Sequence, residues 1–329
     1  MWRLCYHPVM TKTRVTVSAA ANIALIKYWG KLEKGLNQPA TASLSIGLED
    51  LRTTTIIERI EGQSDVIDFN APETARQRIL DFLDLLRKQY EVQGHFHITT
   101  ENNFPTGTGL ASSASGFAAL AIGFSEILNL NLSRQVLSQL ARIGSGSAAR
   151  SVFGGFVEII PADDAFASRI MPAEDWPLAV IVAIASDGTK TVGSSEAMKH
   201  TAATSPYYRE WLRSHVQDMD DARLAIVDRD FEKLADVAEH NCLKMHGAII
   251  TTRPPILYWL PATLAVMHEV RQLRESGTPA FFTIDAGAQV KVICPAEHAK
   301  SINARISELP GILRTIETRV GGEPEITAS

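Results

Sequence analysis

Several short segments of the sequence hold residues whose types and spacing suit the binding of phosphate and carboxylate groups. The first runs from Pro105 to Ser115 as PTGTGLASSAS and leads into an apolar run that begins at Phe117. Glycine-rich loops let backbone N–H groups approach phosphate oxygens, and a following helix N-terminus adds partial positive charge. The serine hydroxyls can donate further hydrogen bonds, although the common GxxxxGK(S/T) pattern is absent. A tight loop before a closely packed helix would use the same residues, so both interpretations stay open.

The second segment is NIALIKYWGK, residues 22–31. Lys27 and Lys31 are four positions apart, and Tyr28, Trp29 and Gly30 lie between them. Two ammonium groups beside a glycine can hold a diphosphate. A surface lysine pair beside a packed aromatic ring is the alternative that the segment alone does not exclude.

The third segment is GSGSAARS, residues 144–151, in which two hydroxyl residues and Arg150 follow a glycine. If a helix begins here, its free N–H groups suit an anion. The planar guanidinium of Arg150 matches a carboxylate or a phosphate. A helix cap followed by an exposed arginine explains the pattern equally well.

The fourth segment is FTIDAG, residues 282–287, where Asp285 leaves an apolar strand and enters a turn of small residues. This is a suitable place for a catalytic carboxylate, although aspartate is also an ordinary turn residue. A weaker polar loop, TKTVGSS, occupies residues 189–195 after another apolar strand.

The histidines and the remaining motifs point to no other chemistry. His95 and His97 share one face of an expected strand, and no nearby carboxylate or cysteine spacing supports a metal site. His240 and His246 lie in an expected helix and are interpreted as core or surface residues. The sequence contains no nucleophile elbow, HExxH motif or dinucleotide fingerprint.

Hydrophobic periodicity and turn residues predict the elements that must position these segments. Ser133 is the expected N-cap of one helix, and a domain boundary is expected in the Pro-, Ala- and Asp-rich stretch 161–177. Helices are predicted at 74–90, 117–128, 211–238, 260–274 and 302–309, and the helix capped by Ser133 is expected to end near residue 143. Strands are predicted at 14–20, 53–58, 95–100, 156–160, 178–185, 281–285, 290–294 and 314–319.

Composition excludes several classes of protein. The 329 residues suffice for about two domains, and 45% of them are hydrophobic. The net charge of −5 argues against general binding to nucleic acid or an anionic membrane. Cys5, Cys242 and Cys294 are scattered, which indicates neither a zinc ribbon nor a disulfide framework. We expect no transmembrane helix, and residues 1–9 are too short and mixed for a secretory signal.

Taken together, the segments resemble those of the mevalonate diphosphate decarboxylases, a family of the GHMP kinase superfamily. The match extends from about Val17 to Val292 with the motifs in the family's order. NIALIKYWGK is its most specific marker, PTGTGLASSAS is similar to the superfamily's phosphate-binding loop, and SGSAARS and the DAG turn complete it.

The resemblance implies an α/β (α+β) fold of two domains with the active site in the cleft between them. Residues 10–176 would form the kinase-type, ATP-binding domain, whose βαβ connection is unusual in being left-handed. Residues 177–329 would form an α+β sandwich. Family members are usually cytoplasmic homodimers that use ATP and Mg²⁺.

The resemblance also implies roles for individual residues, because each matches a position of the family's motifs. Asp285, Lys27 and Arg150 would be catalytic, and Arg150 would bind the substrate carboxylate. The remaining positions would bind the substrate (Tyr28, Lys31, Asn37, Ser145, Gly146, Ser147 and Ser194) or the nucleotide (Pro105, Gly107, Gly109, Leu110, Ala111, Ser112, Ser113 and Ser115).

The implied reaction is the ATP-dependent decarboxylation of (R)-mevalonate 5-diphosphate to isopentenyl diphosphate, CO₂, ADP and phosphate. Two positions depart from the family's pattern: Leu32-Glu33 stand where relatives often have Arg-Asp, and Ser195 stands where some have a cationic residue or Thr. Fewer cations would favour mevalonate 5-phosphate as an alternative substrate. The motifs are also compatible with a GHMP small-molecule kinase without decarboxylation and with a ligand sensor on the same fold.

Overall fold

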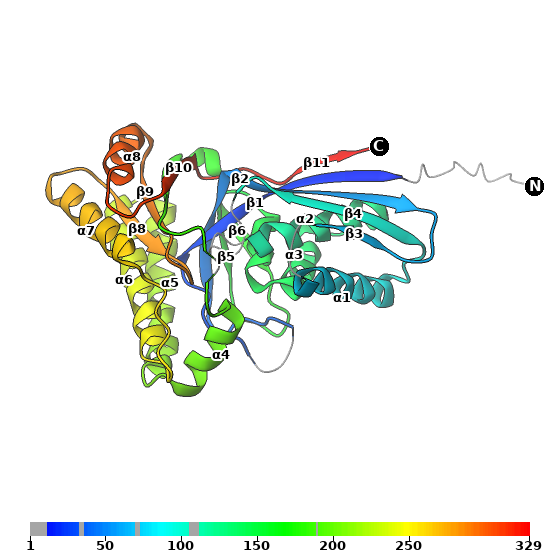
Figure 1. Cartoon of the computed structure of the whole chain (residues 1–329), viewed down its shortest axis with the longest axis horizontal. Helices are drawn as coiled ribbons and strands as arrows, with labels where there is room; N and C mark the ends of the chain where they lie inside the picture. The colour runs from blue at the N-terminus through cyan, green and yellow to red at the C-terminus, as the bar shows by residue number, and fades with distance from the viewer. Residues whose placement is uncertain (1–11, 33–35, 70–72, 105–111, 189) are drawn as a thin grey trace, which may run out of the picture.

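Two β-sheets and the helices that cover them form the structure, a computed structural model that describes residues 12–32, 36–69, 73–104, 112–188 and 190–329. One sheet has the strand order β11-β1-β2-β4-β3, with β5 attached to β2 and β6 to β5. The other has the order β10-β7-β9-β8. Figure 1 shows the first sheet with α1, α2 and α3, and the second with α5 to α8.

The first sheet is built on two long antiparallel strands. Val15, Val17 and Ala19 of β1 alternate with more exposed residues and pack against α2, whereas from Ala19 onward β1 is buried on both faces. The strands of this sheet are β1 (Arg14–Ile26), β2 (Ser43–Ile60), β3 (Val66–Asp68), β4 (His95–Asn102), β5 (Phe156–Ile159), β6 (Ala167–Met171) and β11 (Glu325–Ala328).

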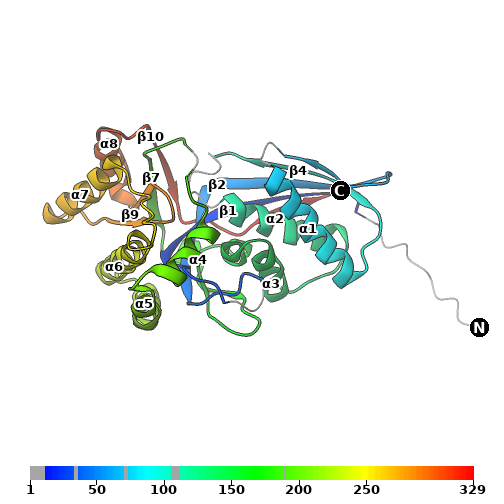
Figure 2. The same cartoon turned by 60° about the horizontal axis from the view of Figure 1, so that its bottom comes forward.

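The helices of the first half cover one side of this sheet, as both views of the cartoon show (Figures 1 and 2). The Ser133 side chain accepts a hydrogen bond from the backbone N of Val136, which confirms Ser133 as an N-cap. The helices are α1 (Glu73–Tyr90), α2 (Ser112–Ile127), α3 (Arg134–Gly144) and the 3₁₀ segments η1 (Gly146–Val152) and η2 (Ala173–Asp175).

The second sheet is buried on both faces, as the continuous apolar run of β7 predicts. Alternate β7 residues face opposite helix layers: Ala179 and Ile181 pack with α7 and α8, and Val180 and Val182 with α5 and α6. The elements of this half are β7 (Leu178–Ile184), α4 (Ser194–Thr204), α5 (Tyr208–Asp228), α6 (Phe231–Ile250), α7 (Pro261–Glu275), β8 (Phe281–Ile284), β9 (Val290–Pro295), η3 (Ala296–His298), α8 (Ala299–Ser307) and β10 (Arg314–Arg319).

Three predictions of local structure are wrong. The helix expected over 211–238 is two helices, because Arg229 adopts the left-handed conformation (φ 55°) and the Asp230 side chain caps α6 at Lys233 N. Helix α2 begins at Ser112 rather than Phe117, since small hydroxyl residues form its first turn. Both long strands also extend well past the predicted ranges 14–20 and 53–58.

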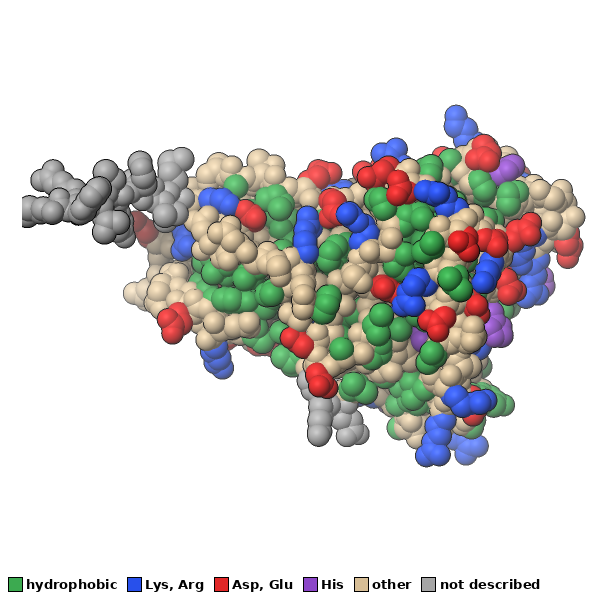
Figure 3. Space-filling model, turned by 180° about the vertical axis from the view of Figure 1, so that it is seen from behind, with side chains coloured by type: hydrophobic (Ala, Val, Ile, Leu, Met, Phe, Trp, Pro, Cys, Tyr) green, Lys and Arg blue, Asp and Glu red, His purple; other side chains and the backbone are tan. Residues whose placement is uncertain are grey.

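The end of the chain returns to the first sheet. Strand β11 pairs antiparallel with β1, with Val15 opposite Ala328 and Ser18 opposite Glu325. The division of the chain near residue 177 stays a prediction, although the last strand lies in the sheet of the first half. The molecular face seen from behind carries acidic and basic side chains interspersed with one another (Figure 3).

Candidate active site

A cavity of about 860 Å³ lies where the ends of β1 and β8 meet the first residues of α2, α4 and η1. Its lining includes Lys27, Ser113, Arg150, Ser194 and Asp285, which belong to segments far apart in the sequence. Figure 2 shows that these elements come from both halves of the molecule, and α4 lies between them. All five segments selected by residue type therefore contribute residues to one place.

Asp285 and two lysines form a charged cluster at the inner end of this cavity. Lys27 Nζ lies 2.8 Å from Asp285 Oδ1 and also donates to Ala24 O at 2.8 Å. Lys291 Nζ lies 3.4 Å from Asp285 Oδ2. Burial alone would raise the pKa of Asp285, but the charges and hydrogen bonds of Lys27 and Lys291 outweigh it and hold this pKa well below its usual range. The carboxylate is therefore ionised at neutral pH.

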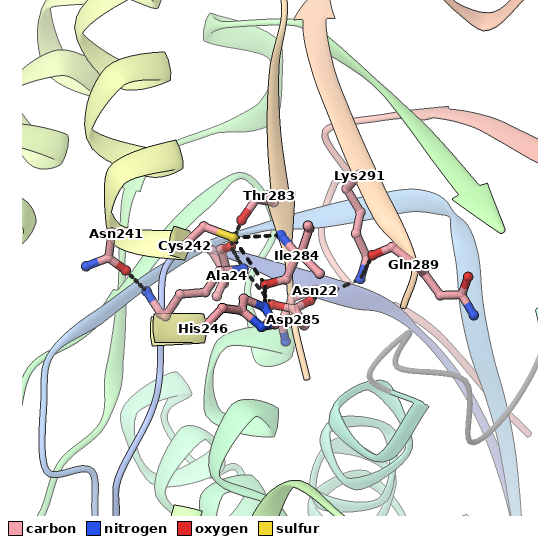
Figure 4. Close-up of polar contacts among 12 residues, drawn as sticks. Asn22, Ala24, Asn241, Cys242, His246, Thr283, Ile284, Asp285, Gln289 and Lys291 are labelled. Carbon is pink, nitrogen blue, oxygen red and sulfur yellow. Dashed lines mark hydrogen bonds and ion pairs between the residues drawn. The ribbon is translucent and has the colours of Figure 1, made fainter. Parts of the chain in front are cut away.

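The β8–β9 hairpin places this aspartate. Strand β8 is buried along its whole length and ends one residue before Asp285. The backbone of Ile284 is held from α6, because its N–H donates to Cys242 Sγ at 3.2 Å and its carbonyl oxygen lies 3.2 Å from His246 Nε2. Figure 4 shows Cys242 and His246 gathered around Ile284 and Asp285. His246 is thus a core residue, as expected, and supports the strand that carries Asp285.

Arg150 is buried in η1 and is held by polar groups of β1 and β2. Its Nε donates to Ser45 Oγ at 2.9 Å, its Nη1 to Ser43 Oγ, and its Nη2 to Asn22 Oδ1 at 3.4 Å. Burial lowers the pKa of Arg150 to about 10, so the guanidinium remains charged at neutral pH. None of these partners is a carboxylate, which leaves the charge of the guanidinium available to an anion in the cavity.

Lys31, Tyr28 and Asn37 form a connected group at another part of the cavity wall. Lys31 Nζ donates to Asn37 Oδ1 at 2.7 Å and to Ser195 Oγ at 2.8 Å, and Tyr28 Oη donates to Asn37 O at 3.1 Å. Burial, followed by the charges of Arg78 and Lys199, lowers the pKa of Lys31, and burial raises the pKa of Tyr28 to about 12. Asn37 therefore orients both groups rather than acting alone.

Small residues bring the backbone of the GSGS segment against this group. A Cβ on Gly146 would lie 2.4 Å from Tyr28 Oη, so only glycine allows the ring to pack there. Ser145 Oγ lies 3.1 Å from Ser113 Oγ and 3.5 Å from Ser147 Oγ. The first turn of α2 and the start of η1 thus present neighbouring hydroxyls to the cavity.

The nucleotide loop is described only in part. Ser112 and Ser113 line the cavity at the start of α2. Ser115 is turned away from it: the side chain is fully buried and its Oγ lies 2.6 Å from Thr53 Oγ1 of β2. The Ser115 hydroxyl therefore faces the sheet, and the expectation that this position binds phosphate stays a prediction. The remaining predicted positions, Pro105, Gly107, Gly109, Leu110 and Ala111, lie outside the described residues.

Three cations near the substrate positions were missed by sequence reasoning. Lys190 Nζ donates to Ser194 Oγ at 2.7 Å and to Ala286 O at 3.3 Å, which connects the predicted polar loop to the aspartate turn. Arg78 of α1 lines the cavity and its Nη2 donates to Gly144 O at 2.7 Å. Lys291 had a usable signal, since a lysine between Val290 and Val292 of a buried strand needs a charged partner.

Two kinds of feature are absent from the described residues, a metal-binding group and a membrane-spanning helix. No group of three or more His, Cys, Asp and Glu among them could hold a metal ion by itself. None of the helices in the described ranges is long and apolar enough to cross a bilayer.

Comparisons with known proteins agree over most of the chain. Residues 19–169 match the diphosphomevalonate decarboxylase-like N-terminal domain, and residues 180–328 match the mevalonate 5-diphosphate decarboxylase C-terminal domain. Diphosphomevalonate decarboxylase of Candida albicans is 33% identical over 95% of this chain and 98% of its own length. The corresponding enzyme of Saccharomyces cerevisiae is 35% identical, over 92% and 83%.

Solved structures of mevalonate diphosphate decarboxylases superpose closely on this chain. Mevalonate diphosphate decarboxylase from Staphylococcus aureus is 34% identical with a TM-score of 0.89, over 98% of this chain and 100% of that one. A complex of MDDEF with MVAPP, AMPPCP and magnesium is 37% identical with a TM-score of 0.88, over 96% and 99%. The two-domain fold expected from the resemblance is thereby confirmed, and the chain belongs to the diphosphomevalonate decarboxylase family.

Proposed function

We propose that this chain catalyses the ATP-dependent decarboxylation of (R)-mevalonate 5-diphosphate, giving isopentenyl diphosphate, CO₂, ADP and phosphate. One observation carries the proposal: an ionised Asp285, a buried Arg150 with no carboxylate partner among the described residues, and a row of hydroxyls and cations line the same cavity. A 3-hydroxy acid that carries a diphosphate needs all three kinds of group: a carboxylate for its hydroxyl, a guanidinium for its carboxylate, and hydroxyls and cations for its phosphates. Membership of the family agrees with this reaction.

The first step is phosphorylation of the substrate's tertiary hydroxyl, because hydroxide is a poor leaving group. Asp285 accepts a hydrogen bond from this hydroxyl and directs its oxygen toward the γ-phosphorus of ATP. Since the low pKa of Asp285 makes it a weak base, the proton moves to it only as the new O–P bond forms. Lys27 stabilises the carboxylate, and positioning with charge stabilisation supplies most of the rate enhancement.

Elimination and decarboxylation follow on the same carbon skeleton. Phosphate leaves C3 with the electron pair of the C–O bond, and positive charge develops at C3. Arg150 holds the C1 carboxylate through its planar donors. The C1–C2 bond then breaks, CO₂ departs, and the electron pair forms a double bond between C2 and C3 of the substrate skeleton, which gives isopentenyl diphosphate. By holding the carboxylate, Arg150 thus keeps the C1–C2 bond in an orientation from which its electron pair can move toward the electron-poor C3.

The diphosphate would occupy the part of the cavity that Lys31, Arg78 and the serine hydroxyls line. Arg78 approaches this region from α1, so it can supply the positive charge that Ser195 does not. This favours the diphosphate over the monophosphate as substrate. The proposed substrate-binding group is Tyr28, Lys31, Asn37, Arg78, Ser145, Gly146, Ser147, Lys190 and Ser194.

Magnesium fits this site when it arrives on the nucleotide. The hydroxyl oxygens of Ser112 and Ser113 line the cavity, and hard oxygen donors with substrate phosphates suit Mg²⁺. Both serines would hold the ion, which neutralises charge on the transferring phosphoryl group when bound. The domain boundary near residue 177, the homodimer and the cytoplasmic location remain parts of the proposal that rest on the family resemblance.

The test compares mevalonate, its 5-phosphate and its 5-diphosphate as substrates for ATP-dependent CO₂ release, with ADP measured in parallel. We expect equal amounts of ADP and CO₂, and a kcat/KM for the diphosphate at least ~10-fold above that for the monophosphate, because charged hydrogen bonds are lost with one phosphate. ADP formation without CO₂ would identify a kinase. Preference for the monophosphate would overturn the assigned substrate.

A further inference from the structure

Asn241 of α6 connects the end of β1 to the partly buried ion pair that Asp218 forms with Lys244. Its Oδ1 accepts a hydrogen bond from the backbone N of Lys27 at 2.8 Å. Lys27 directly follows β1, so Asn241 accepts a hydrogen bond from the first backbone N–H beyond the strand. Figure 4 shows Asn241 beside the cluster that contains Asp285 and Ala24.

The Asn241 amide is held in one orientation by two side chains of α5. Its Nδ2 donates to Asp218 Oδ2 at 2.6 Å and to His215 Nδ1 at 3.2 Å. A carboxylate only accepts hydrogen bonds, so the nitrogen of the amide must face Asp218 and the oxygen must face Lys27. Asp218 is held in turn by Lys244, whose Nζ lies 2.5 Å from its Oδ2.

His215 completes this arrangement as a neutral ring. Its Nε2 lies 2.7 Å from Ala42 O, which fixes the proton on Nε2 and leaves Nδ1 free to accept from Asn241. Burial lowers the pKa of His215 to about 4, so the ring stays neutral in the physiological range. Each contact in the series from Lys244 through Asp218 and Asn241 to the Lys27 backbone therefore joins a donor to an acceptor.

Asn241 is fully buried and is not among the described residues that line the cavity. The site residue to which it is hydrogen-bonded is Lys27, whose ammonium group contacts Ala24 O and Asp285. We propose that Asn241, oriented by the Asp218–Lys244 ion pair, is a positioning residue that fixes Lys27 against Asp285. The inference deepens the proposed function and rests on it, because it assigns Lys27 a catalytic role.

The substitution Asn241→Asp gives a pH-dependent test. The groups that face position 241 are Asp218 and His215 of α5, Lys244 of α6 beyond Asp218, and the Lys27 backbone. An ionised aspartate could not donate to Asp218, and two adjacent carboxylates raise the pKa of the pair. Once one proton is bound, its O–H can donate to Asp218 while its carbonyl oxygen accepts from Lys27, which restores these two hydrogen bonds of the native amide but not the one to His215 Nδ1.

We therefore expect Asn241→Asp to lower kcat by about 10- to 100-fold at about pH 8, as misplacement of a catalytic group does, with KM changed less than about 3-fold. The ratio of its kcat to that of the parent should rise as the pH falls toward about 6, because protonation restores the donor. Asn303→Asp is the matched control, since Asn303 also donates to a carboxylate, Glu317, but lies on α8 and does not line the cavity. A ratio independent of pH, or an unchanged kcat, would overturn the inference.

A double variant, Asp218→Asn with Asn241→Asp, exchanges the two groups. The amide introduced at position 218 can then donate to an ionised carboxylate at position 241, which also accepts from Lys27. We therefore expect at least about one-third of parental kcat without the pH dependence of the single variant. If the single variant does not fold, this variant decides, and a kcat below about one-tenth of the parent or failure to fold overturns the inference. Parent protein that releases no CO₂ would refute the proposed function instead.

Discussion

Charged side chains that would be unstable alone compensate one another at the centre of this site. Lys27 and Lys291 are each 1% exposed, and both contact the carboxylate of Asp285. Burying one member without the others would leave an unpaired charge, which costs several kcal/mol. The low pKa of Asp285 therefore belongs to the whole cluster, and it keeps the carboxylate ionised at neutral pH.

Replacing the carboxylate should abolish most turnover. We expect Asp285→Ala to lower kcat by at least ~100-fold, because a positioned acid–base group and its charge are lost. Nucleotide affinity, measured by titration calorimetry, should change little, because the proposed role of Asp285 is at the substrate's hydroxyl.

The isosteric Asp285→Asn serves as the control for this experiment. It keeps the shape and removes the charge, so it should be impaired to a similar extent as Asp285→Ala. Near-parental CO₂ release by either variant would contradict the role given to Asp285.

Residue types in the sequence predicted much of this site. Lys27 stands out because it is paired with Lys31 beside a glycine, whereas Arg150 and Asp285 lie in segments of small residues, and all three line the cavity. Arg78 gave no signal, since an arginine beside the buried Ile79 of an amphipathic helix is ordinary. The orientation of Ser115 was also unpredictable, because it depends on where α2 begins relative to β2.

The helices and strands could be predicted where local sequence signals agree, and the predictions are wrong where a tertiary contact decides the ends of an element. The alternation in β4 and the apolar run of β7 correspond to strands. The break between α5 and α6 had only Asp230 as a signal, and apolar residues continue on both sides of it. The length of β1 could not be predicted from residues 21–26, whose lack of alternation reflects burial of one face in the core with α5 and α6 and of the other beside η1 and the cavity.

The N-cap of α3 should contribute measurably to stability. Helix α3 leads directly into the serines at 145 and 147, and Ser133 caps its first turn. We expect Ser133→Ala to lower the free energy of unfolding by about 1 kcal/mol, because one backbone N–H loses its acceptor. Urea unfolding followed by circular dichroism measures this difference.

Ser133→Asp is the matched variant for this measurement. An aspartate keeps an acceptor and adds a negative charge at the helix N-terminus, so its stability should equal or exceed that of the parent. Equal stability of parent and Ser133→Ala would show that the cap contributes nothing.

At the scale of the whole molecule, the two halves share one structural framework. Strand β1 extends from the core of α2 to the core shared by α5, α6 and β7, and its end carries Lys27. The cavity is therefore bounded by elements that one continuous strand joins. This connection could not be predicted from sequence, because it depends on which sheets the long strands enter.

Removing β11 should weaken the first half while leaving the chemistry intact. We expect deletion of residues 324–329 to lower the free energy of unfolding by at least ~2 kcal/mol, at about 1 kcal/mol for each net hydrogen bond lost from the β1–β11 ladder. The thermal midpoint measures the loss. The kcat of the folded fraction at low temperature should be retained, since β11 does not line the cavity.

Glu325→Gln is the control for the deletion, because it removes the exposed ion pair with Arg52 and keeps the strand. Exposed ion pairs contribute little, so this variant should behave as the parent does. A deletion variant as stable as the parent would mean that β1 does not depend on its partner.

The pairing of the first strand with the last has a consequence for biosynthesis. Residues 325–328 are synthesised long after β1, so until they emerge from the ribosome β1 keeps an open edge whose N–H and C=O groups can pair with another chain. Completion of the sheet must therefore wait for β11, and nascent chains stalled before residue 325 would be the species most exposed to aggregation and to chaperone capture.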